Sequence, residues 1–310
     1  MTARFNFIKN SKKFYIISSV AVAVIILCSF IIRPQLDIQF RGGSMITYSY
    51  TGGIDINAFA QTAESLLNER VSVRESTDIA TQTTTLVVSL PGTRSLSSEQ
   101  MASFTQGLQD AYPSNNLQSM QISNVDPTIG REFFSKCLVA VTFASILLVL
   151  YIALRFSKIG GMSAGVFAVL ALLHDVVIAY GAFVVFQIPI DDNFIAVILT
   201  ILGYSINDTI VIYDRIRENK RLMGGKTPVA EFVNASLNQC IRRSVNTAVT
   251  SIAAMIIISV VAYFYNVSSI QSFALPMVFG LIAGTFSTLC IAGPLWVKWQ
   301  EYKLRQKAAA

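Results

Sequence analysis

The residues most able to do chemistry in this sequence are Asp208 and the neighbouring Asn207, which lie well inside an apolar run within residues 191–219. A carboxylate at the centre of a membrane-spanning helix costs about 2.5–3.5 kcal/mol on insertion scales, so it pairs with a cation or takes up a proton. Both outcomes indicate a proton-linked role. The alternative is that Asp208 is only a polar contact between helices.

The residues around Asp208 give this predicted helix a polar side and an apolar side. At about 100° per residue, its polar residues fall within an arc of roughly 140°. The arc consists of Thr200, Gly203, Tyr204, Asn207, Asp208, Asp214 and Arg215. The opposite side consists of Leu199, Leu202, Ile206 and Ile210. We expect the apolar side to face lipid and the arc to face other helices or a water-filled cleft.

A second ionisable pair, His174 and Asp175, stands in the apolar run of residues 160–186. Asp175 belongs to a stripe of small residues along which helices pack closely. The stripe consists of Ala164, Ala168, Ala171, Asp175, Ala179 and Ala182. His174 is expected to point away from the stripe, and imidazole ionises near neutral pH, which suits proton exchange. The alternative is a buried pair that orients the neighbouring helices.

Arg242 and Arg243 begin a further apolar run, and a polar stripe in register with Arg243 follows them. The stripe consists of Asn246, Thr247, Thr250 and Ser251. In the functional interpretation it faces the arc around Asp208, so that Arg243 influences the protonation of that carboxylate. In the alternative interpretation both arginines only anchor the helix on the cytoplasmic side, and we favour this for Arg242.

These residues belong to helices that are expected to cross a membrane. The chain has 310 residues, of which 53% are hydrophobic and 14% charged, and its mean hydropathy is +0.55. This composition predicts a polytopic α-helical membrane protein. Each predicted span is near the 20 or so residues that cross a bilayer. The six spans cover residues 14–32, 133–154, 160–186, 194–213, 245–264 and 273–297.

Four segments of the chain are rich in basic residues. They are the segment before the first span, the segment after the last span, and the connections between the second and third and between the fourth and fifth spans. All four lie on the same side of the membrane in a model with six spans. Residues 34–131, on the other side, hold five basic and nine acidic residues. The positive-inside rule therefore predicts cytoplasmic termini and an extracytoplasmic segment 34–131. The net charge of +6 reflects this orientation and does not indicate nucleic-acid binding. The first span is predicted to be an uncleaved signal-anchor in the cell membrane.

Residues 34–131 are long enough for a domain between the first two spans. Alternating strand signals and helical periodicity predict a ferredoxin-like α+β order, β-α-β-β-α-β. The predicted strands are residues 44–50, 71–77, 83–90 and 117–125, and the predicted helices cover residues 56–69 and 98–111. The segment holds no histidine and no cysteine. We therefore expect a binding or scaffold domain without catalytic residues.

The other parts are residues 1–33 with the first span, residues 132–297 with the remaining spans, and a cytoplasmic tail, residues 298–310. Within the cytoplasmic connection 214–243, the fourth helix is expected to stop at Gly224–Gly225. Thr227–Pro228 then begin an amphipathic helix that is expected to lie at the membrane surface. The chain has no CxxC motif or Cys/His spacing for a metal, and we expect neither a metal site nor a cofactor.

Four motifs in this order are similar to those of the SecF family of protein-export membrane subunits, within the resistance–nodulation–division superfamily. They are FRGG before the extracytoplasmic segment, ALLHDV, GYSINDTIVIYDRIREN and SLNQCIRRSVNTAVTS. The resemblance covers nearly the whole chain. It implies a subunit that pairs with SecD in a twelve-helix bundle and associates with the SecYEG channel. Such a subunit assists the release of unfolded preproteins after the SecA motor has acted.

The resemblance also implies roles for the residues above, because Asp208 matches the family's proton-site position and Arg243 matches the arginine at the start of the fifth span. The proton-coupling candidates are Asp208, Arg243, Asn207, Asp175, His174 and Asp214. Passage of H⁺, or of Na⁺ in its place, would switch the bundle between two packings and move the outer domain, without covalent chemistry on the substrate. The alternatives are a stand-alone proton-linked exporter of lipids or small molecules and a non-transporting scaffold.

Overall fold

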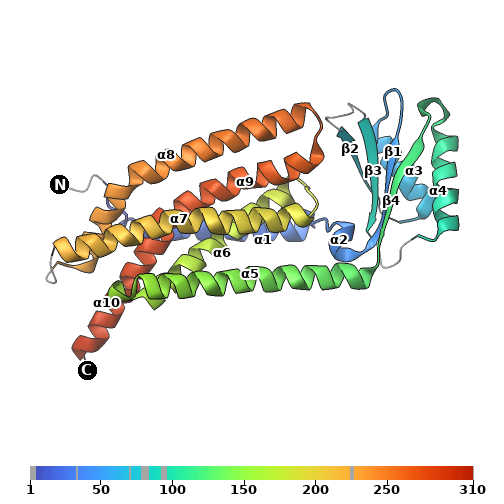
Figure 1. Ribbon diagram of the computed structural model, residues 1–310. Coiled ribbons are helices and arrows are strands. Elements are labelled where there is room, and N and C mark those ends of the chain that lie inside the picture. Colours follow the sequence, from blue (N-terminus) through green and yellow to red (C-terminus); the bar gives the residue numbers. More distant parts are fainter. Residues whose placement is uncertain are drawn as a thin grey trace.

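Figure 1 shows the computed structural model, which describes residues 5–32, 34–69, 71–77, 84–91, 96–223 and 227–309. Long helices form a bundle, and a sheet with two helices forms a separate layer at one end of it. The long helices are α1 (Ser11–Ile32), α5 (Pro127–Arg155), α6 (Gly161–Val185), α7 (Asp192–Leu222), α8 (Val229–Phe264), α9 (Ser268–Ser287) and α10 (Gly293–Ala309). A π-helical turn, Thr288–Ala292, joins α9 to α10. Six helical stretches of the described chain are long and apolar enough to span a membrane, as predicted.

Helix α6 lies at the centre of the bundle and packs against α1, α5, α7 and α9. The predicted stripe of small residues is confirmed as a packing surface, because all of its members are buried. Helix α9 approaches α7 closely at two glycines. A Cβ on Gly280 would lie 2.1 Å from Ile201 Cδ1, and a Cβ on Gly284 would lie 3.2 Å from Ser205. The absence of a side chain is what allows the two helices to come this near.

The outer helices of the bundle expose large apolar side chains, including Phe30 and Ile31 on α1 and Leu154 on α5. These side chains are 71–80% exposed. An apolar surface that extends over several helices is typical of contact with lipid. The chain is therefore a multi-pass membrane protein.

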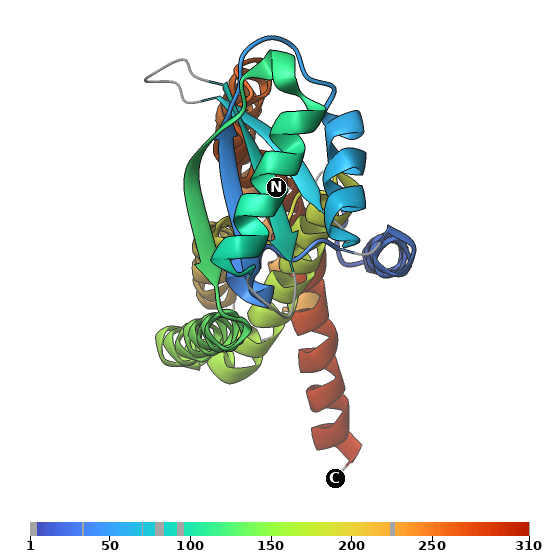
Figure 2. The same cartoon turned by 90° about the vertical axis from the view of Figure 1, so that its right-hand side faces the viewer.

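The sheet domain lies between α1 and α5 in the chain and has the element order that the sequence predicts. We call it the outer domain, after the side of the membrane predicted for residues 34–131. Its elements are β1 (Gly43–Ser49), α3 (Ile56–Leu67), β2 (Ser72–Thr77), β3 (Thr84–Pro91), α4 (Ser98–Ala111) and β4 (Gln118–Val125). The strands are antiparallel in the order β2-β3-β1-β4. Helices α3 and α4 cover the sheet face that points away from the bundle (Figure 2).

Local sequence signals explain where these elements begin. Gly42 and Gly43 adopt φ values of 83° and 130°, which permit the turn into β1. Ser97 and Gln100 form a capping box at the start of α4. Asp126 caps α5 through the Thr128 N–H at 2.8 Å, so this helix begins at Pro127, inside the range assigned to the outer domain from sequence.

A short connection fixes the outer domain to the start of α7. Leu36 pairs with Ile190 in an isolated parallel bridge. The Asp37 N–H donates to the Ile190 carbonyl at 3.1 Å, and the Ile190 N–H donates to the Gln35 carbonyl at 2.8 Å. The connection then forms a short helix, α2 (Ile38–Arg41), that the sequence did not predict. These hydrogen bonds link the segment just before α7 to the chain that enters β1.

At the opposite end of the bundle the structure corrects one prediction. The amphipathic helix expected after Pro228 is not a separate helix at the membrane surface, because it is the first part of α8, which continues without a break to Phe264. Its apolar residues Phe232, Val233 and Leu237 are buried in the bundle core. An apolar face that packs on protein is not available to lipid. The predicted stop at Gly224–Gly225 lies outside the described residues.

The predicted tail, residues 298–310, is helical in its described part, which belongs to α10 and extends to residue 309. The first described residues pack beside α8 at the same end of the bundle. The Phe7 N–H donates to Asn234 Oδ1 at 2.8 Å, and the Phe5 N–H donates to Asn238 Oδ1 at 3.0 Å. Both ends of the described chain thus lie away from the sheet (Figure 1).

Candidate functional site

Asp208 lies half-buried in the middle of α7, where this helix packs against α8. Its Oδ1 accepts a hydrogen bond from Ser244 Oγ at 2.7 Å, and Ser244 is 2% exposed. A serine hydroxyl supports a carboxylate but does not neutralise its charge. The charge of Asp208 therefore has to be balanced by a cation or removed by a proton.

Arg243 precedes Ser244 on α8 and attracts the Asp208 carboxylate electrostatically. In the described part of the chain, no direct ion pair joins the two residues. Arg243 is exposed, and so is its neighbour Arg242. The structure thus places Arg243 near the carboxylate, with Ser244 as the residue that contacts it.

Exposed polar residues form a strip beside Asp208 on α7 and α8. We define the strip as Thr200, Asn207, Asn246, Thr247 and Thr250. Gly203 lies on the same side of α7, and a Cβ placed there would meet no atom within 4 Å. Because polar groups within apolar spans are costly in contact with lipid, another protein surface or water has to cover this strip.

Asp175 lies in the interior of the bundle and is 0% exposed. Its Oδ2 accepts hydrogen bonds from Ser205 Oγ of α7 at 3.0 Å and from Ser287 Oγ of α9 at 2.8 Å. Ser205 precedes Asp208 by three residues, or about 4.5 Å along the helix axis. Asp175 and Asp208 are therefore close in depth, and Ser205 connects α6 to the helix that carries Asp208.

The sequence-based expectation for His174 was wrong. It predicted that the imidazole points away from the stripe, but His174 Nδ1 lies 3.1 Å from Asp175 Oδ1. The ring packs beside Phe286 of α9, with centroids 6.2 Å apart, and the side chain is only 10% exposed. Rotation about the side-chain bonds brings the ring back to the neighbouring carboxylate, which a helical wheel cannot show.

A hydroxyl cluster beside Asp175 was missed by sequence reasoning. Thr288 Oγ1 lies 3.4 Å from Ser205 Oγ and 3.3 Å from Thr209 Oγ1. Thr288 is the first residue of the π-helical turn, and such turns often occur at functional sites. The available signal was the presence of serine and threonine within apolar spans.

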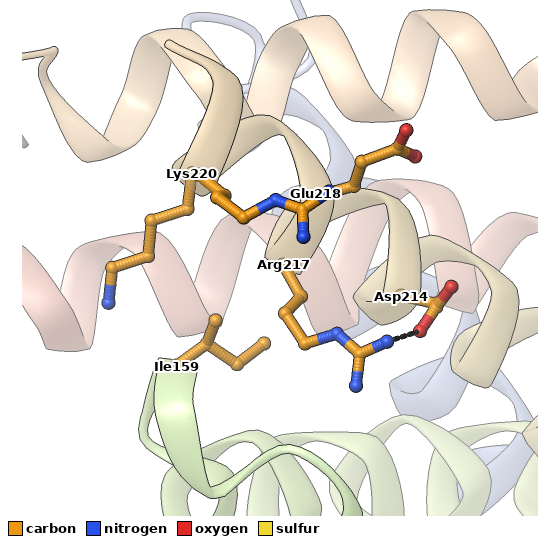
Figure 3. A pocket seen from close by; sticks show the side chains of 6 residues that line it. Ile159, Asp214, Arg217, Glu218 and Lys220 are labelled. Atoms are coloured by element: carbon orange, nitrogen blue, oxygen red, sulfur yellow. Dashed lines mark hydrogen bonds and ion pairs between the residues drawn. The ribbon is translucent and has the colours of Figure 1, made fainter. Parts of the chain in front are cut away.

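Asp214 does not join Asp208 but belongs to an ion-pair network at the end of the bundle (Figure 3). Its Oδ1 accepts from Arg155 at 3.3 Å and from Arg217 at 2.6 Å. Both guanidinium groups lie over the Phe156 ring, at 5.4 and 6.0 Å from its centroid. Residues 5–32, 34–69, 71–77, 84–91, 96–223 and 227–309 contain no group of three or more His, Cys, Asp or Glu side chains that could hold a metal ion.

Comparison with known proteins places this geometry in a family. Residues 105–302 match the family described as "Protein export membrane protein SecD/SecF, C-terminal". The chain is 30% identical over 308 residues to the protein translocase subunit SecF of Alicyclobacillus acidocaldarius, covering 99% of this chain and 96% of that protein. It is 31% identical to the protein translocase subunit SecDF of Bacillus subtilis, covering 99% of this chain and 40% of that protein.

A solved structure agrees with these sequence relatives. The crystal structure of SecDF from Thermus thermophilus superposes with a TM-score of 0.79 at 28% identity, covering 97% of this chain and 39% of that one. The chain thus matches SecF proteins over nearly their whole length and SecDF proteins over about two fifths of theirs. The chain therefore belongs to the SecD/SecF family of protein-export membrane proteins, as a subunit of the SecF type.

Proposed function

We propose that this chain works with a SecD partner and uses the proton motive force to assist late translocation and release of preproteins through the Sec channel. The observation that carries the proposal is the Asp208 carboxylate inside an apolar span, hydrogen-bonded to Ser244 at 2.7 Å and electrostatically attracted by Arg243. A group placed in this way changes its charge when a proton binds. No covalent chemistry on the substrate is required.

The need for a SecD partner is supported by the exposed polar strip on α7 and α8. SecDF relatives are single polypeptides more than twice as long as this chain. In our proposal the spans of SecD cover the strip and complete the surroundings of Asp208. The assembly then acts beside the SecYEG channel and the SecA motor on unfolded preproteins, and lipid surrounds the remaining helices.

The coupling step follows from the contacts of α7. Protonation of Asp208 removes its attraction to Arg243 and changes the preferred packing of α7 against α8. About 24 Å of continuous helix separates Asp208 from Asp192, the first residue of α7. Because Ile190 is hydrogen-bonded to the connection that enters the outer domain, movement of α7 reaches that domain directly. Each proton supplies about 2.3 kcal/mol per 100 mV of membrane potential.

The test is preprotein release from membrane vesicles with an imposed proton gradient, with each variant co-expressed with its SecD partner. The variants are Asp208→Asn, which keeps the size of the side chain and removes its titration, and Arg243→Ala. Asp192→Asn is the matched control, because Asp192 is an exposed acid at the outer end of the same helix. A parallel sodium gradient distinguishes H⁺ from Na⁺ as the coupling ion.

We expect Asp208→Asn to abolish the dependence of release on the gradient while the complex with SecD still assembles. Arg243→Ala should reduce this dependence, and Asp192→Asn should behave like the wild type. If Asp208→Asn releases preprotein with the wild-type gradient response, Asp208 serves only packing and the scaffold alternative replaces our proposal.

A further inference from the structure

A pocket of about 700 Å³ opens where the last turns of α7 meet a short helix, η2 (Ser157–Ile159), that joins α5 to α6. Its lining residues are Ile159, Asp214, Arg217, Glu218, Lys220 and Arg221. Nothing in the proposed coupling mechanism uses this pocket. We infer that it binds the phosphate of an anionic phospholipid headgroup, in the membrane leaflet at the end of the bundle that carries both termini.

The charges around the pocket favour an anion. Basic residues outnumber the acids of this cluster, Asp214 and Glu218. The basic residues are Arg155, Arg215, Arg217, Lys220 and Arg221. Asp214 is shared by two arginines, and Glu218 pairs with Arg215 at 2.5 Å. The named side chains therefore carry a net charge of +3, five basic less two acidic, which attracts an anion.

The donor geometry suits a phosphate. Arg217 uses one guanidinium nitrogen for Asp214, so most of its five N–H donors are not used by that contact. Figure 3 shows Arg217 directed toward Asp214, whereas Glu218 points away from Ile159. Asp214, the acid that contacts the Arg217 guanidinium, is also paired with Arg155. Arginine can bind a phosphate through two parallel hydrogen bonds, and an exposed lysine adds a further charge.

The depth of the pocket corresponds to the lipid headgroups. Arg155 ends α5 and pairs with Asp214, which places Asp214 at the edge of the apolar span. At 1.5 Å per residue, Arg217 lies about 4.5 Å and Arg221 about 10.5 Å further along α7. The headgroup layer on each side of a bilayer is about 5–8 Å thick. Arg217 thus lies within this layer and Arg221 at its border with water, from which a long side chain can reach back to a phosphate.

Apolar side chains beside the pocket favour a lipid over free phosphate. Leu154, which precedes Arg155, is 71% exposed, and Met162, in the first turn of α6, is 63% exposed. These residues flank η2 in the sequence and offer a surface for acyl chains. Basic pockets between membrane helices on the cytoplasmic side are known to bind anionic headgroups. Soluble phosphate would gain the charge contacts but not the apolar ones.

The experiment is a lipid titration of the purified full chain in detergent, followed by native mass spectrometry. The probes are phosphatidylglycerol, phosphatidylcholine with matched acyl chains, and inorganic phosphate as a competitor. Lys220→Gln combined with Arg221→Gln removes two exposed charges of the pocket. Arg305→Gln combined with Lys307→Gln removes two exposed charges of α10 and is the matched control. A thermal unfolding scan of each variant establishes that it is folded.

We expect phosphatidylglycerol to bind more tightly than phosphatidylcholine. The pocket variant should weaken its binding at least tenfold, which is about 1.4 kcal/mol, and the α10 variant less than twofold. Equal affinity for the two lipids would overturn the inference, as would equal loss in the two variants. Displacement of the lipid by millimolar inorganic phosphate would also overturn it, because the site would then be one for free phosphate.

Discussion

Arg74 on β2 is predicted to hold the outer domain in place on the bundle. Its guanidinium lies 3.7 Å from Asp37 Oδ2, in the connection that pairs with Ile190. It also attracts Asp191, the residue that caps α7. Arg74→Ala therefore leaves two partly buried carboxylates near each other without this cation.

The cost of this substitution can be worked out from the burial of the pair. Two charges 3.7 Å apart at an effective dielectric constant of about 20 attract each other by about 4 kcal/mol. Truncation of one partner of a fully buried pair costs about 3–5 kcal/mol, and exposed pairs contribute at most about 1 kcal/mol. The side chain of Arg74 is 30% exposed and that of Asp37 is 9% exposed. We therefore expect a loss of about 2 kcal/mol in the free energy of docking, which increases the undocked population about 30-fold.

The effect of Arg74→Ala on docking of the outer domain depends on pH in a definite direction. Burial raises the pKa of Asp191, and the nearby acids Asp192 and Asp37 raise it further, whereas the hydrogen bond from Asn193 and the charge of Arg74 lower it. A carboxyl group whose pKa is raised in the folded state contributes stability at low pH that is lost as the pH rises through that raised pKa. Arg74→Ala raises this pKa further. The part of its cost that comes from Asp191 should therefore be absent at acidic pH, where Asp191 is neutral, and should add to the loss of the Asp37 contact as the pH rises toward neutral.

Hydrogen exchange measured by mass spectrometry tests this prediction, because the amides of Asp37 and Ile190 are bonded across the junction. We expect both amides to exchange about 30-fold faster in Arg74→Ala. Arg74→Lys should restore part of the protection. Arg131→Ala is the control, because it removes an exposed charge at the start of α5. The reasoning is refuted if the two amides exchange at the same rate in Arg74→Ala and in Arg131→Ala.

Two further predictions concern packing and are measured as unfolding free energies or melting temperatures. Gly280→Ala should destabilise the bundle by about 1–3 kcal/mol, because its Cβ would lie 2.1 Å from the buried Ile201 side chain. Gly203→Ala is the control and should be nearly neutral, because its Cβ would meet no atom within 4 Å. An equal effect of the two substitutions would contradict the predicted close approach of α9 and α7. Phe59→Ala should destabilise the outer domain by about 3–5 kcal/mol, because Phe59 is 0% exposed in the core of that domain. Leu66→Ala should cost much less, because Leu66 is 45% exposed on the same helix.

Secondary structure and the positions of the six spans could be predicted from the sequence to a large extent. The six spans depend on runs of about 20 apolar residues, which are visible in the sequence without any tertiary information. The elements of the outer domain follow from alternating strands and from caps such as Ser97, which is confirmed in its capping box. The exceptions are α2, which has only four residues, and the continuous α8. A short helix has no periodicity to detect, and a turn between helices cannot be distinguished by composition from an uninterrupted helix.

The candidate site was predictable as a set of residues but not as a set of contacts. Asp208 and Asp175 were recognised because a carboxylate in an apolar span is costly wherever its partners lie. Their hydrogen-bond partners, Ser244 on α8 and Ser287 on α9, were not recognised, because serine is common in membrane helices and only the packing brings these two hydroxyls to the carboxylates.

The sequence by itself determined that this chain crosses a membrane and which of its residues are too costly there to be incidental, because transfer free energies depend on residue type and on local periodicity. The tertiary structure decided which residues meet. It divided the predicted polar arc between Asp208, near Arg243, and Asp214, in the ion-pair network with Arg155 and Arg217. It also tied the outer domain to Ile190 and Asp37, which lie on different sides of that domain in the sequence. Such contacts depend on how helices far apart in the chain pack, and no local pattern encodes that packing.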